Sequence, residues 1–173
     1  FPKASLGIYL VESDSIIKIP KLKSFYLPEV GEWMAYILDH NKEIKVPGKK
    51  KKKKKKKKKG EPKVSSKGKR LCFFNPIENV KKEFKDVKYV YKGRNDDMFA
   101  FTIHQKFDTL DSNFVHLFDT KTLEATKIFS AVKANSLKFN YQTNEVAFYG
   151  TQDTSEVKVY DLYYWNQVDG VQN

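Results

Sequence analysis

Cysteine is almost absent from this sequence. Cys72 is the only one in 173 residues, which excludes an internal disulfide and leaves the redox compartment undecided. The residue lies in the short apolar run Leu71–Phe74, a position typical of a buried, unreactive thiol.

Long apolar segments are also lacking. No stretch approaches the roughly 18 apolar residues that a membrane-spanning helix needs. The chain begins at Phe1 rather than at a methionine, and it carries no signal-peptide pattern. We therefore expect the sequence to be a piece of a longer protein.

The motifs of catalysis and metal binding are missing as well. The nearest approach to a Gly-x-Ser-x-Gly nucleophile elbow, Lys3–Gly7, lacks the first glycine, and no glycine-rich phosphate loop occurs. The three histidines, His40, His104 and His116, form no pair with metal-ligand spacing, and we expect them to be ordinary surface or interior residues. Asp96 and its neighbour fall in a polar turn, where aspartate commonly bonds its own backbone. The sequence thus predicts no catalytic residue, no metal site and no cofactor.

Positive charge is plentiful but confined to one segment. The formal charge of +12 falls to +1 without an unbroken run of eleven lysines. The members of this run are Lys49, Lys50, Lys51, Lys52, Lys53, Lys54, Lys55, Lys56, Lys57, Lys58 and Lys59.

Three interpretations of the lysine run stay open. It is a solvated, disordered insertion, or an electrostatic contact to anionic lipid headgroups, polysaccharide or nucleic acid, or else a targeting signal or sequence artefact. Nucleic acid is disfavoured, because no base-stacking aromatic residues alternate with the lysines.

Short β-branched and aromatic runs dominate the remainder. From Asp86 to Val132, strands near 89–91, 98–103, 114–118 and 126–129 alternate with Gly, Asn and Asp clusters. Such spacing predicts a four-stranded antiparallel meander. We expect a polar break between its second and third strands, at residues 105–113.

The same unit recurs on either side. Met34–Tyr36, Phe99–Phe101 and Val146–Phe148 occupy equivalent second-strand positions. Phe74–Asn75, Phe118–Asp119 and Tyr160–Asp161 are interpreted as equivalent ends of the third strand, 44 and 42 residues apart. A period in the low forties with four strands per unit is typical of propeller blades. The small Ala would let sheets approach closely, while the aromatic residue would fill the layer between blades.

The predicted fold is therefore all-β: consecutive four-stranded antiparallel blades of a partial β-propeller with a disordered lysine-rich insertion. Residues 1–22 form the end of a preceding blade, and residues 23–86 form a blade interrupted by the insertion at 39–69. Residues 87–132 form a complete blade, and residues 133–173 form most of a further blade and a tail.

Several segments together resemble the amino-terminal propeller region of prolyl-oligopeptidase-family (S9) serine peptidases, especially the large secreted members of Bacteroidetes-type bacteria. The segments are Phe1–Ile8, Asp14–Lys18, Lys21–Phe25, Trp33–Tyr36, the lysine-rich insertion, Gly68–Leu71, Phe118–Thr122 and Val159–Trp165. The resemblance implies that the propeller precedes an α/β-hydrolase domain, absent from this chain, and limits which peptides reach its catalytic triad.

The implied function is that of a non-catalytic propeller that gates peptide access and docks on the hydrolase domain of a secreted or periplasmic serine peptidase. The alternative is a propeller scaffold that binds protein or envelope ligands without peptidase activity. In a third hypothesis the basic loop tethers the protein to an anionic surface.

Overall fold

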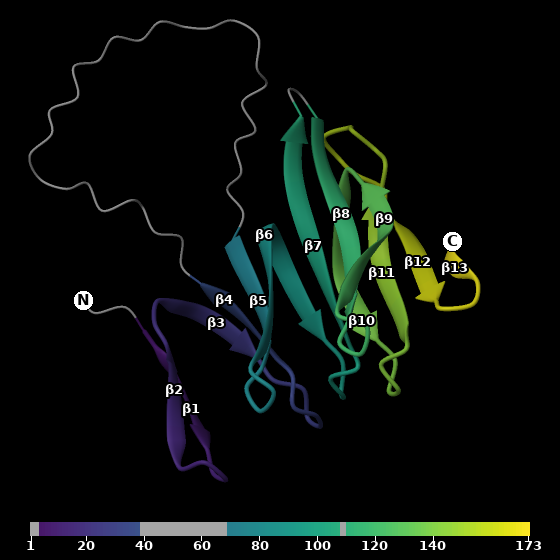
Figure 1. The fold of residues 1–173 in the computed structure, drawn as a ribbon. Coiled ribbons are helices and arrows are strands. Elements are labelled where there is room, and N and C mark those ends of the chain that lie inside the picture. The colour runs from purple at the N-terminus through teal and green to yellow at the C-terminus, as the bar shows by residue number, and fades with distance from the viewer. Residues whose placement is uncertain (1–3, 39–68, 108–109) are drawn as a thin grey trace, which may run out of the picture.

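The computed structural model describes residues 4–38, 69–107 and 110–173, and within these ranges all regular structure is β-strand (Figure 1). The strands are β1 (Leu6–Leu10), β2 (Ser15–Ile19), β3 (Leu22–Tyr26), β4 (Met34–Leu38), β5 (Lys69–Asn75), β6 (Val80–Lys92), β7 (Met98–Phe107), β8 (Leu110–Asp119), β9 (Glu124–Ala131), β10 (Lys133–Phe139), β11 (Glu145–Thr151), β12 (Asp161–Asn166) and β13 (Gly170–Gln172). The described residues include no helix that could cross a membrane.

All strand pairing is antiparallel, in sheets of two, seven and four strands. The seven-stranded sheet is continuous only because β6 is long and changes partners. Its first half pairs with β5 and its second half with β7, and at the junction Asp86 has a φ of 60°. A left-handed residue bends the strand, so β6 closes one four-stranded unit and opens the next.

We name these units by their strands. The N-terminal hairpin is β1 and β2. The first blade is β3, β4, β5 and the start of β6, the second is the end of β6 with β7, β8 and β9, and the third is β10 to β13. An all-β fold of consecutive four-stranded blades confirms the predicted fold class, whereas the residue limits assigned to each blade from the sequence stay predictions.

The blades pack face to face in chain order, from the purple hairpin to the green and yellow third blade (Figure 1). A separate buried cluster fills each of the three layers between neighbours. The pleat of β4 shows how one strand serves two layers: Met34 and Tyr36 face the hairpin, while Ala35 and Ile37 face the second blade. Both faces of a blade are therefore interior, apart from those at the two ends of the series.

The layer between the first and second blades is mainly aromatic. Phe73 is fully buried and stacks on Phe118 with ring centroids 4.3 Å apart. Phe99 and Phe84 lie 5.0 and 5.8 Å from the same Phe73 ring. As predicted, Phe118 fills an interblade layer, and the small Ala35 lies in the same layer.

A repeated turn marks the end of each third strand. The side-chain oxygen of Asn75, Asp119 or Asn166 accepts hydrogen bonds from the backbone N–H groups two and three residues later, at 2.7–3.1 Å. The fourth residue after each one has a positive φ, of 55° at Asn79, 59° at Leu123 and 72° at Gly170. One turn geometry thus closes the outer hairpin of all three blades.

This turn corrects one prediction. Tyr160–Asp161 does not end the third strand of the last blade, because Asp161 begins β12. The residues equivalent to Phe118–Asp119 are Trp165–Asn166, since Val146 pairs with Trp165 as Phe99 pairs with Phe118. The landmark is therefore spaced by 44 and then 47 residues.

The predicted polar break at 105–113 is also wrong in extent. β7 continues to Phe107 and β8 starts at Leu110, with Gln105 paired to Ser112. Polar side chains are compatible with a hairpin ladder that extends past the apolar core, because the backbone supplies the ladder's hydrogen bonds.

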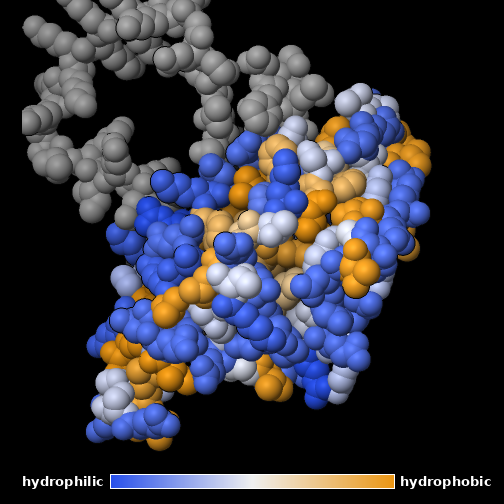
Figure 2. Space-filling view, turned by 45° about the vertical axis from the view of Figure 1, so that its right-hand side comes forward, coloured by the Kyte–Doolittle hydropathy of each residue, from blue (hydrophilic) through white to orange (hydrophobic). Residues whose placement is uncertain are grey.

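Apolar side chains remain exposed on the N-terminal hairpin, at the lower left of Figure 2. Ile16 is 60% exposed there, and Val11 is 78% exposed. At the other end of the series, Leu162 and Tyr164 are exposed on β12 of the third blade. The two end faces of the described stack thus remain partly apolar.

Substitution of Gly170 by alanine tests the repeated turn. No atom lies within 4 Å of an added Cβ, so the change isolates the cost of a positive φ. We expect Gly170→Ala to lower the free energy of unfolding by about 1 kcal/mol, measured by urea titration. Gly7→Ala is the control, because Gly7 lies in β1 and its added Cβ meets only an ordinary contact at 3.9 Å. Equal unfolding free energies for the Gly170 variant and the native protein would contradict the assigned turn.

Candidate ligand site at the inner strands

The first strand of each blade is its inner strand: β3, the second half of β6, and β10. These strands run in the same direction, and β10 contacts β6 directly. Their loops to the second strands, residues 27–33, 93–97 and 140–144, emerge at one end of the molecule, the lower end in Figure 1. Leu38 and Lys69, which flank the insertion, lie at the opposite end of the first blade.

Asp96 connects the first two of these loops. Its carboxylate accepts hydrogen bonds from the backbone N–H groups of Glu32 and Trp33, at 2.6 and 2.7 Å. Gly31 has a φ of 118°, and a Cβ there would overlap the Asp96 carboxylate. Asp96 thus binds the backbone of the neighbouring blade rather than that of its own turn, which the sequence did not predict.

Thr143 makes the equivalent connection between the second and third blades. Its hydroxyl oxygen accepts hydrogen bonds from Arg94 N at 3.1 Å and Asn95 N at 3.4 Å. Gly93 provides the space, since a Cβ on it would overlap the Thr143 side chain. In both connections a side-chain oxygen of the following blade accepts hydrogen bonds from two successive backbone N–H groups. The glycine that precedes these two residues leaves room for the side chain.

A cavity of about 820 Å³ lies along the ends of the three inner strands. Its volume falls in the range of small-molecule and cofactor sites. It is lined by Tyr26, Glu29, Val90, Tyr91, Lys92, Gly93, Arg94, Leu137, Lys138, Phe139, Asn140 and Tyr141. This set contains three cationic side chains, one carboxylate and three tyrosines. We call this cavity the inner-strand pocket.

A smaller cavity of about 500 Å³ is lined by other residues of the first two loops and by the turn at Asn75. It is mainly acidic, with Glu32, Glu78 and the Asp97 carboxylate among its lining residues. Lys121 neutralises part of this charge through an ion pair to Asp97 at 2.9 Å. No group of His, Cys, Asp and Glu in the described part of the chain could hold a metal ion.

Cys72 and His116 have internal structural positions, as predicted. Cys72 is fully buried, and burial raises the pKa of its thiol to about 11. His116 stacks on Phe101 with centroids 5.1 Å apart, and burial lowers the pKa of its imidazole. His104 pairs with Asn113 across β7 and β8, away from the inner-strand pocket. None of the three lies in either cavity described above.

Lys49 to Lys59 and His40 lie outside the described residues, as does the disordered insertion predicted at 39–69, apart from Lys69, which begins β5. The interpretations of the lysine run therefore stay hypotheses. The residues that line the inner-strand pocket were not singled out from the sequence, where Lys92–Asp97 reads as an ordinary polar turn. The signal that could have found them is the position of this turn, which follows the inner strand in every unit.

Comparisons with known proteins agree with this architecture. No family model matches the sequence, and no curated protein matches it. Among solved structures, the β-propeller domain of the trilobed protease from Pyrococcus furiosus is similar over 88% of this chain, with a TM-score of 0.58 and 15% identity. The fold is that of a β-propeller.

Other similar propellers also belong to peptidases. An acylaminoacyl peptidase from Pyrococcus horikoshii matches 87% of this chain with a TM-score of 0.52 and 13% identity. A structure from a study of two prolyl endopeptidases also matches 87%, with a TM-score of 0.52 and 12% identity. This chain covers 41% of the trilobed protease's propeller domain, and 24% and 21% of the other two chains. The resemblance to peptidase propellers is thus confirmed at the level of the fold.

A double-mutant cycle tests the Asp96 connection between propeller blades. Asp96→Ala leaves the Glu32 and Trp33 N–H groups without this acceptor, which we expect to cost about 1–3 kcal/mol of unfolding free energy. Gly31→Ala adds strain and overlap with the carboxylate. In the double variant the overlap is gone. We therefore expect its loss of unfolding free energy to be smaller than the sum of the two single-variant losses by about 0.5 kcal/mol or more. Additive losses would contradict the close approach of Gly31 to Asp96.

The stability contribution of His116 should depend on pH. Because the folded-state pKa is lowered, the contribution is fully present above the unfolded pKa of about 6.5 and is lost as pH falls through the folded pKa. We expect the native protein to lose more unfolding free energy between pH 7 and pH 5 than the His116→Gln variant does. Parallel pH profiles from chemical unfolding would show that the imidazole is not held neutral by burial.

Proposed function

We propose that this chain is the non-catalytic β-propeller portion of a serine peptidase of the prolyl-oligopeptidase family. The observation that carries the proposal is the propeller fold itself, which is shared with acylaminoacyl peptidase and prolyl endopeptidase structures over 87% of the chain. The sequence has no Gly-x-Ser-x-Gly elbow, so the catalytic serine would belong to a hydrolase domain outside these residues. Secretion or export to the periplasm belongs to the same proposal.

In this proposal the propeller gates peptide access. Its blades are joined by buried aromatic layers and by the Asp96 and Thr143 connections, which together make a stiff wall. A stiff wall around a central passage admits extended peptides and excludes folded chains on size alone. In two prolyl endopeptidases, inter-domain dynamics has a role in catalysis and specificity. Motion between this propeller and its hydrolase domain would complete the gate.

A binding propeller without peptidase activity is the second candidate. The observation that favours it is the inner-strand pocket, whose volume of about 820 Å³ suits a ligand whether or not hydrolysis follows.

Assays of the natural gene product that contains residues 1–173 separate the two candidates. We expect cleavage of short fluorogenic peptides with proline or a small residue before the scissile bond, and we expect a serine-directed phosphonate to abolish it. Gating predicts that an intact globular protein is cleaved far more slowly than the same protein after unfolding. Absence of phosphonate-sensitive cleavage would overturn the peptidase proposal, while equal rates on folded and unfolded protein would overturn gating.

A further inference from the structure

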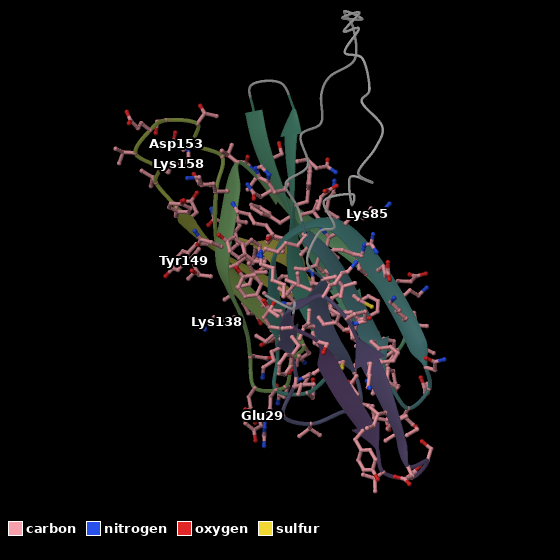
Figure 3. The ribbon with its side chains drawn as sticks, turned by 90° about the vertical axis from the view of Figure 1, so that its left-hand side faces the viewer. Glu29, Lys85, Lys138, Tyr149, Asp153 and Lys158 are labelled. Atoms are coloured by element: carbon pink, nitrogen blue, oxygen red, sulfur yellow. The ribbon has the colours of Figure 1, made fainter. Side chains whose placement is uncertain are left out.

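The residues that line the inner-strand pocket carry an excess of positive charge. Lys92, Arg94 and Lys138 line it, and Glu29 is its one acidic residue. Figure 3 labels Glu29 and Lys138 on one side of the molecule, with Lys85 on the opposite side. An anion in the pocket therefore meets a local positive field that the smaller, acidic cavity does not offer.

Arg94 is the residue best placed to bind an anion. Its Nε donates a hydrogen bond to the Glu29 carboxylate at 3.2 Å, and its guanidinium carbon lies 4.2 Å from the centre of the Tyr141 ring. Within residues 4–38, 69–107 and 110–173, no acceptor bonds its two terminal Nη groups. A surface ion pair and a cation–π contact thus favour this orientation of the guanidinium, while the edge formed by its two Nη groups stays open to a ligand.

The backbone around Arg94 is fixed as well. Its carbonyl accepts hydrogen bonds from Glu29 N at 2.7 Å and Val30 N at 3.2 Å, and its own N–H donates to Thr143. The loop is therefore attached to both neighbouring blades. A ligand that binds Arg94 would therefore cost little backbone ordering entropy on the protein side.

The remaining wall suits the apolar part of a peptide. Tyr26, Tyr91 and Phe139 are partly exposed in the pocket, and the buried Leu137 lies among its lining residues. Aromatic side chains offer broad apolar contact with little loss of side-chain entropy. A group that combines one negative charge with an adjacent aliphatic or aromatic side chain matches this surface.

We propose that the inner-strand pocket binds the carboxylate of a peptide, with the Arg94 Nη groups donating two parallel hydrogen bonds and Lys138 adding charge. A carboxylate suits the site better than a phosphate, because Glu29 lies beside Arg94 and repels a dianion more than a monoanion. The carboxylate is that of a peptide C-terminus or of an acidic side chain. The inference does not rest on the proposed peptidase activity, because its test measures binding alone.

Fluorescence anisotropy of labelled peptides tests the proposal, with the natural gene product pretreated with the serine-directed phosphonate in every arm. Three peptides share one neutral, apolar sequence: one ends in a free carboxylate, one ends in an amide, and one is the amide with glutamate as its last residue. Binding of the first alone identifies a C-terminal carboxylate. Binding of the third as well identifies carboxylates in general, and both results support the proposal.

Three variants complete the experiment. We expect Arg94→Gln to weaken binding of the carboxylate peptide by tenfold or more, since it removes a charge-assisted pair. Lys138→Gln, at an exposed position that should not affect folding, should weaken it about two- to fivefold. Lys85→Gln makes the same charge change on the opposite side and should leave the affinity unchanged. Equal binding of all three peptides, no binding of any, or equal effects of Arg94→Gln and Lys85→Gln would overturn the proposal.

Discussion

The structure depends on the burial of both faces of each blade against its neighbours. A sheet in this position has no solvent-facing side, so its central strands become apolar on every residue, as β4 is from Met34 to Ile37. The layer around Phe73 shows the consequence most clearly. Its ring is stacked on Phe118 of the next blade and surrounded by three further phenylalanines, so each blade contributes half of a core that neither could form alone.

Because both faces of a blade are buried, ligands can bind only where the strands end. With both faces used for packing, polar side chains gather at the loops, where Asp96 and Thr143 hold neighbouring blades together through backbone N–H groups. Arg94 lies between these two connections and is held by residues from both adjacent blades. Stability and the candidate site are thus built from one set of loops.

Much of the fold could be predicted from the sequence, because its main signals are local. The pairs Phe74–Asn75 and Phe118–Asp119 mark a turn whose side-chain bonds span only three residues. The end of the third strand in the last blade is predicted at the wrong position because residues 160–166 contain two pairs of an aromatic and a polar residue, Tyr160–Asp161 and Trp165–Asn166. Only strand pairing shows which of them faces Val146. The candidate site could not be predicted from the sequence, because Arg94 and Glu29 are 65 positions apart. No periodic sequence pattern indicates a contact between two loops.

The most direct test of this account is a double-mutant cycle across the interface between the first two complete blades. Phe73→Leu and Phe118→Leu, singly and together, would be introduced into the natural protein, and the free energy of unfolding of each form would be measured by chemical denaturation. The account predicts a coupling energy of about 1 kcal/mol, as expected for a stacked aromatic pair beyond its buried area. If the loss of unfolding free energy in the double variant equals the sum of the two single losses within about 0.3 kcal/mol, direct packing of one blade on the next would be contradicted.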